Sequence, residues 1–264
     1  MPRDNASGRA AHISDEEWQI RCDLAALYRL MAHFRWTDHI YTHISARLPG
    51  SDHHFLINRY GVHFHEMCAS ELVKIDPDAR VVDGDPNGAD KVNGAAFTVH
   101  SAIHMGRQDL MCVVHTHTAA GIGVSAQAEG LLPITQHSLQ FYGHIGYFDY
   151  NAPSWDHTVQ KQERARLVEA LGPHDALILR NHGLVGAGHS IAEAFHTIYM
   201  LERSCSAQIA AQSGGGALSR PSRDVCERTA AFLRDPATRT PESFELFWEA
   251  SLRLIENDKP DYRS

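Results

Sequence analysis

The sequence lacks a long apolar run, a basic cluster and any Cys-x-x-Cys pair. No apolar stretch approaches the roughly 20 residues of a membrane span, and residues 1–11 have no apolar signal-peptide core. The net charge of -8 argues against a nucleic-acid or anionic-membrane surface. The five cysteines are odd in number and scattered, which is typical of free thiols, not of disulfides or a zinc ribbon. We therefore expect a cytoplasmic protein that binds neither nucleic acid nor membranes.

The remaining composition is that of a globular protein. With 43% hydrophobic and 21% charged residues among 264, the chain is long enough for a full core. Segments with helical spacing of apolar residues and short apolar runs occur together, which predicts an α/β fold. We expect a disordered tail at residues 1–13, one catalytic domain at 14–215 and a helical extension at 216–264, after the glycine-rich break at 213–216.

Start signals and apolar runs locate individual elements. Ser14 with Glu17, and Ser190 with Glu193, have the spacing of capping boxes that open helices. A further helix is predicted at 157–171, where Gly172 and Pro173 end it. Short apolar runs predict strands at 43–48, 55–58, 72–75, 111–114, 133–137 and 176–179.

Histidines follow two of these predicted strands. His115-Thr116-His117 closes the run 111–114, and side chains two apart on a strand point to the same side. His182 follows the run 176–179 in the same way. Three neutral imidazoles at strand ends bind a metal ion and leave positions open for water or substrate. A His-x-His pair alone is not rare among 19 histidines, and a loop histidine such as His182 also suits a backbone hydrogen bond.

Five short motifs, taken in order, carry a family resemblance. They are residues 42–47 (Thr-His-Ile-Ser-Ala-Arg), 56–76, 92–97 with His100, 115–117, and 180–184 (Arg-Asn-His-Gly-Leu). Over about residues 18–211 they resemble the class II aldolase/adducin family. The resemblance implies a three-layer α/β/α fold with a mainly antiparallel central sheet. It also implies a homo-oligomer, usually a homotetramer, with sites near subunit interfaces.

The same resemblance implies a metal cofactor. By position, its metal ligands are His115, His117 and His182. Zn²⁺ is the favoured ion, and Fe²⁺, Mn²⁺ and Co²⁺ are alternatives. In the aldolases of the family, zinc polarises a carbonyl group and stabilises the enediolate that forms when the adjacent carbon–carbon bond breaks. The substrate-binding residues expected by position are Tyr60, Gly61 and Asn93.

The sequence departs from the sugar-phosphate aldolases of the family. Ala96 stands where those enzymes have a catalytic glutamate, and a methyl group neither accepts a proton nor binds a metal. At the positions of their phosphate-binding residues the chain has His43, Tyr60, Gly94 and Ala95. Phosphate capture needs hydroxyl or backbone donors, or a cation. These departures favour a substrate without phosphate.

Three residues are candidates for acid–base catalysis in place of the glutamate: His43, His137 and Tyr142. Imidazole titrates near neutrality, so either histidine is suited to relay a proton. His137 and Tyr142 are equally consistent with aromatic packing at a subunit interface.

The sequence thus predicts a metal-dependent carbon–carbon lyase, of the aldolase or decarboxylase type. Its substrate would be a small non-phosphorylated 2-oxo or 2-hydroxy acid that chelates the metal. Two alternatives stay open. One is a non-haem iron oxygenase, because three ligands with open positions also suit ferrous iron. The other is a non-catalytic, adducin-like interaction module with a residual metal site, although such a module has no physical need for three convergent imidazoles.

Overall fold

The computed structural model describes residues 10, 12–50, 53–83, 92–149, 151 and 156–264. The expected disordered tail, residues 1–13, falls largely outside this part of the chain. None of the helices in the described ranges is long and apolar enough to cross a membrane.

The described strands form one eight-stranded sheet in the order β4-β3-β2-β1-β5-β8-β7-β6. Neighbouring strands run antiparallel except β6 and β7, which are parallel, so the expectation of a mainly antiparallel sheet is confirmed. The strands are β1 His43–Arg47, β2 Phe55–Asn58, β3 Leu72–Ile75, β4 Val81–Asp83, β5 Cys112–Thr116, β6 Gly146–Phe148, β7 Ala176–Leu179 and β8 Gly183–Gly188.

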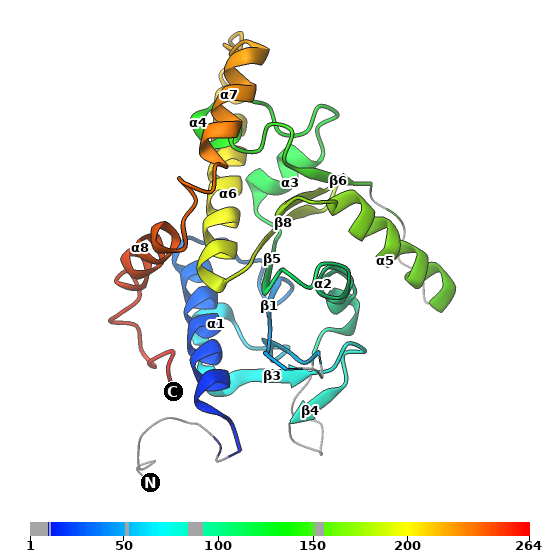
Figure 1. Ribbon diagram of the computed structural model, residues 1–264, viewed down its shortest axis with the longest axis vertical. Helices are drawn as coiled ribbons and strands as arrows, with labels where there is room; N and C mark the ends of the chain where they lie inside the picture. Colours follow the sequence, from blue (N-terminus) through cyan, green and yellow to red (C-terminus); the bar gives the residue numbers. More distant parts are fainter. Residues whose placement is uncertain (1–9, 11, 51–52, 84–91, 150, 152–155) are drawn as a thin grey trace.

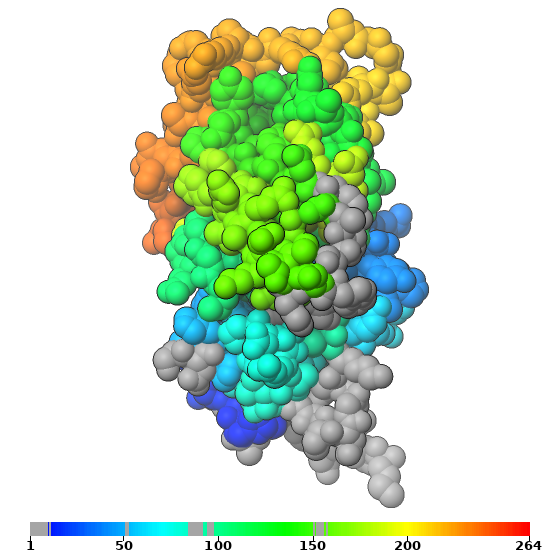
Figure 2. Space-filling view, turned by 90° about the vertical axis from the view of Figure 1, so that its right-hand side faces the viewer, coloured from blue at the N-terminus to red at the C-terminus, as the bar shows by residue number. Residues whose placement is uncertain are grey.

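Helices lie on both faces of this sheet (Figure 1): α1 and α6 on one, α2 and α5 on the other. Seen from the side, α5 forms much of the surface in Figure 2. The helices are α1 Asp15–His33, α2 Gly94–Gly106, α3 Ala119–Ser125, α4 Gln136–Leu139, α5 His157–Leu171, α6 Ile191–Ser213, α7 Arg223–Leu233 and α8 Pro241–Leu252, with short 3-10 turns η1 Phe64–Glu66 and η2 Ala69–Glu71.

Strand alternation assigns the side chains of β5 to two separate apolar clusters. Cys112 and Val114 pack with residues of α1 and α6. Val113, between them, packs with residues of α2 and α5. The two faces of the sheet therefore have different partners, and successive residues of β5 serve opposite sides.

Two helix starts agree with the sequence, and one predicted strand is wrong. Ser14 and Ser190 cap α1 and α6, each accepting a hydrogen bond from the backbone N–H three residues later.

Residues 133–137, predicted as a strand, lead into the short helix α4. Thr135 caps it by accepting from the backbone N–H of Ser138, and the Ser138 side chain bonds back to Thr135. These local side-chain hydrogen bonds compete with strand pairing and favour a helical turn.

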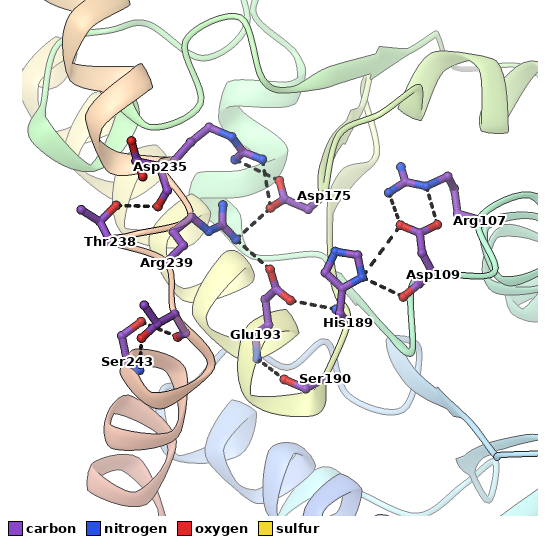
Figure 3. A network of polar contacts seen from close by, with 12 residues as sticks. Arg107, Asp109, Asp175, His189, Ser190, Glu193, Asp235, Thr238, Arg239 and Ser243 are labelled. Carbon is purple, nitrogen blue, oxygen red and sulfur yellow. Dashed lines mark hydrogen bonds and ion pairs between the residues drawn. The ribbon is translucent and has the colours of Figure 1, made fainter.

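The C-terminal helices pack onto other helices, α8 onto α6 and α1, and α7 onto α4. Phe244 and Trp248 of α8 belong to the same apolar cluster as α1 and α6. Asp175, just before β7, pairs with Arg234 at 3.2 Å and with Arg239 at 3.0 Å, in the segment that joins α7 to α8 (Figure 3). This polar network lies at the end of the sheet where β5 and β7 begin.

Candidate metal centre

The register of three strands brings the histidines together at the opposite end of the sheet. In the β5–β8 pair, His115 faces Val185, and in the β7–β8 pair, Leu179 faces Gly183. The turn that carries His182 therefore lies beside the end of β5. The convergence expected from the sequence is a direct result of this pairing.

The three imidazoles face one another. The Nε2 atoms of His115 and His117 are 2.8 Å apart, and the ring of His182 is centred 4.8 Å from each of the other two. One ligand atom from each residue lies within 4.8 Å of the others. Two nitrogen atoms bound to one tetrahedral zinc ion lie roughly 3.3 Å apart, so a small outward shift of the rings accommodates the ion.

Hydrogen bonds fix which ring nitrogens face the centre. The Nδ1 of His115 lies 2.9 Å from the carbonyl oxygen of Leu184, to which it donates. The Nδ1 of His117 lies 3.0 Å from Oδ2 of Asp38. The lone pair of the His115 Nε2 then faces the Nε2 of His117, and a proton or a metal cation between the two nitrogen atoms satisfies this contact. Metal-binding histidines typically have this type of outer hydrogen bond.

Burial keeps two of the imidazoles neutral. It lowers the pKa of His115 well below its ordinary value, and the neighbouring histidines lower it further. Burial, with a contribution from His117, also lowers the pKa of His182 to about 4. A neutral imidazole is the form that binds a metal ion, so these two are ready to do so at neutral pH.

The conformation of the turn before β8 depends on Asn181 and Gly183. Asn181 has a φ of 57°, a left-handed conformation that asparagine tolerates better than most residues. A Cβ on Gly183 would lie 2.2 Å from the carbonyl oxygen of Thr116 and 3.2 Å from Cδ2 of His117. The absence of a side chain at Gly183 therefore lets β8 approach β5 where His182 joins the cluster.

His43 lies beside the candidate ligands in a buried row of polar side chains. In the β1–β5 pair it faces His115, and their rings are centred 5.5 Å apart. Its ring is 4.4 Å from that of His100. Behind them, the Ser45 hydroxyl lies 2.6 Å from Nδ1 of His100 and 2.7 Å from Nε2 of His104. The sequence indicated His43 and His100, but not the part of Ser45 and His104 in this row.

The other candidate residues lie on other segments of the described chain. His137 is exposed in α4, and Tyr142 follows α4, which packs against α6 and α7. Tyr60 is 37% exposed, and Gly61 has a φ of 98° that favours glycine. Asn93 is partly buried just before α2. The roles of these five residues stay predictions. The side chain at Ala96 lies outside the described part of the structure.

The protein is of the α/β class, with a mainly antiparallel sheet that presents three convergent imidazoles at one end as a candidate metal site, and comparison with known proteins specifies the family. The model of the Class II Aldolase and Adducin N-terminal domain matches residues 22–209. The chain belongs to this family, as the resemblance implied.

Solved structures and known sequences include both aldolases and adducins among its relatives. An aldolase II superfamily protein from Pseudomonas syringae is 47% identical, with a TM-score of 0.88 over 98% of this chain and 100% of the other. L-fuculose 1-phosphate aldolase from Glaciozyma antarctica is 26% identical, with a TM-score of 0.80 and 96% of each chain covered. Alpha-adducin of Rattus norvegicus is 42% identical over 249 residues, 90% of this chain but 33% of the adducin.

Proposed function

We propose that the protein is a divalent-metal-dependent carbon–carbon lyase, of the aldolase or decarboxylase type, in the cytoplasm. Its proposed substrate is a small non-phosphorylated 2-oxo or 2-hydroxy acid. The observation that carries the proposal is the convergence of His115, His117 and His182, whose ligand atoms lie within 4.8 Å of one another. These residues would hold Zn²⁺, or alternatively Fe²⁺, Mn²⁺ or Co²⁺. A bound divalent ion would act as a Lewis acid for charge that develops on a substrate oxygen.

Burial differs among the three candidate ligands, and the more exposed side is the proposed route for a substrate. His115 is buried, whereas His117 and His182 are only partly so. An acid with adjacent carboxylate and carbonyl oxygens would approach from the side of His117 and His182. Three protein ligands leave positions for such a chelating molecule.

His43 is the proposed proton donor or relay on the enclosed side. Its ring packs against that of His115 and is 5% exposed, so a proton held there would be shielded from bulk water. The family resemblance assigns a phosphate contact to this position. A buried imidazole in its place supports a substrate without phosphate.

His137 and Tyr142 would act across a subunit interface. Both lie in or next to α4, outside the histidine cluster of their own chain. We propose that the protein self-associates, as a tetramer in the manner usual for the family, and that a neighbouring chain brings these residues near the site.

The test is metal content and turnover together. Protein purified without added metal is analysed for bound elements, then assayed with a broad panel of 2-oxo and 2-hydroxy acids. Wild type and the control His174→Ala, altered near the other end of the sheet, should bind metal stoichiometrically and cleave at least one acid. His115→Ala should lose both properties. Activity that survives in His115→Ala, or no turnover of any acid by metal-loaded protein, contradicts the proposal.

Two outcomes would favour the alternatives. The identity with alpha-adducin supports an interaction module, which would retain metal and turn over no acid. An iron oxygenase would stop turning over when oxygen is removed, while a lyase would continue.

A further inference from the structure

Thr116, the last residue of β5, lies between His115 and His117 but faces the other side of the sheet. Strand alternation directs His115 and His117 away from α6 and Thr116 toward it. The Thr116 hydroxyl donates to Oε1 of Glu202 in α6 at 2.5 Å. The Thr118 hydroxyl donates to Oε2 of the same carboxylate at 2.7 Å. One carboxylate thus holds the residues on both sides of His117.

The same contacts connect β5 to the helix that follows it. The Thr118 hydroxyl also accepts from the backbone N–H of Gly121 at 3.0 Å, and so caps α3. Glu202 therefore fixes the strand end and the start of α3 at once. The position of the His117 backbone is set from the α6 side, while Asp38 orients its imidazole from the other side.

Burying the carboxylate of Glu202 costs free energy. It is 0% exposed, and within the described residues it forms no ion pair with a lysine, arginine or histidine. A buried carboxylate without a cation destabilises a fold unless hydrogen bonds compensate. Here two threonine hydroxyls are its hydrogen-bond donors. An apolar residue would pack against α3 and β5 at a lower cost, so packing alone does not explain an acid here.

We propose that Glu202 is a positioning residue of the metal centre, acting through Thr116 and Thr118 to hold His117 in place for metal binding. The inference rests on the proposed metal site and assigns to it a residue from the opposite face of the sheet.

Four variants of the full chain test this role. Glu202→Gln removes the charge and one of two acceptors, and Thr116→Val removes one donor while nearly keeping the shape. Thr116→Ser restores the hydroxyl. Thr197→Val is the matched control, because Thr197 is buried in the same helix and its hydroxyl has no hydrogen-bond partner among the described residues. The readouts are the Zn²⁺ dissociation constant, by competition with a chromophoric chelator, and the visible spectrum of Co²⁺-loaded protein.

We expect Glu202→Gln and Thr116→Val to bind Zn²⁺ about tenfold more weakly and to change the Co²⁺ spectrum, as loss of outer-shell contacts does at metal sites. Thr116→Ser and Thr197→Val should match wild type. Unchanged affinity in Glu202→Gln and Thr116→Val would overturn the positioning role and leave the metal site intact. The positioning role would also be overturned if Thr116→Ser lost as much Zn²⁺ affinity as Thr116→Val. If wild type binds no Zn²⁺, the proposed function fails and this inference with it. If one variant does not fold, the other decides.

Discussion

Replacing Glu202 by glutamine should change stability in a pH-dependent way in metal-free protein. Burial raises the pKa of this carboxyl from 4.5 to about 7, while the hydroxyls of Thr116 and Thr118 lower it. Between these two pH values the folded chain keeps a proton that the unfolded chain releases. The contribution of this proton to the free energy of unfolding is therefore complete below pH 4.5 and is lost as pH rises through 7. At about 1.4 kcal/mol per pKa unit, the loss is about 3 kcal/mol.

Glutamine is neutral at every pH, so Glu202→Gln should remove this loss. Its side chain has a single acceptor oxygen for two threonine hydroxyls, and the hydrogen bond given up costs roughly 1 kcal/mol. The variant should then be roughly 2 kcal/mol more stable than wild type at pH 8, and slightly less stable at pH 5. The same variant is expected to bind Zn²⁺ more weakly, so stability and metal affinity should move in opposite directions.

Urea unfolding at pH 5 and pH 8, in the presence of a chelator, measures the effect. Histidines also titrate in this range, but they do so in both proteins, and the difference between variant and wild type cancels their contribution. The control Thr197→Val should differ from wild type by the same amount at both pH values. A Glu202→Gln difference that does not change between pH 5 and pH 8 would refute the reasoning, since the carboxyl would then have the same pKa in both states.

Three further substitutions have expected results. His182→Ala should abolish stoichiometric metal binding, measured by elemental analysis, because two imidazoles remain. Gly183→Ala should destabilise the fold by roughly 1–3 kcal/mol in urea unfolding and weaken metal binding, because its Cβ would meet the backbone of β5 at 2.2 Å; unchanged stability would contradict the close approach. Asp175→Ala should lower stability by roughly 2 kcal/mol, because Arg234 and Arg239 lose their shared, buried partner, while Zn²⁺ affinity stays at the wild-type value.

The local sequence pattern was enough to predict that two of the three clustered histidines lie on one side of the sheet. The alternation of side chains along β5 places His115 and His117 on one side whatever the rest of the fold. The proximity of His182 depends on the β5–β8 and β7–β8 registers, which no local pattern contains. Its position after the apolar run 176–179 made it a candidate ligand, and the order of motifs in the family assigned it to the same site.

Contacts between distant segments could not be predicted. Glu202 is 84 residues from Thr118, and Asp38 is 79 residues from His117, so neither pair leaves a periodic signal. The error at residues 133–137 has a local cause. Apolar and β-branched residues suggested a strand there, but the reciprocal bonds of Thr135 and Ser138 start a helix instead.

The buried row of polar side chains behind His43, formed by His100, Ser45 and His104, has hydrogen bonds whose directions can be assigned. The Nδ1 of His104 lies 3.4 Å from the carbonyl oxygen of Leu110, which can only accept, and burial lowers the pKa of both His100 and His104. Neutral His104 then has a bare Nε2, and the Ser45 hydroxyl, with its single hydrogen, donates to it. His100 must in turn donate from Nδ1 to Ser45, which leaves its own Nε2 without a proton. The carbonyl of Leu110 thus sets which group donates and which accepts in each hydrogen bond of this row. Reversing the direction of one of these hydrogen bonds requires the others to reverse with it.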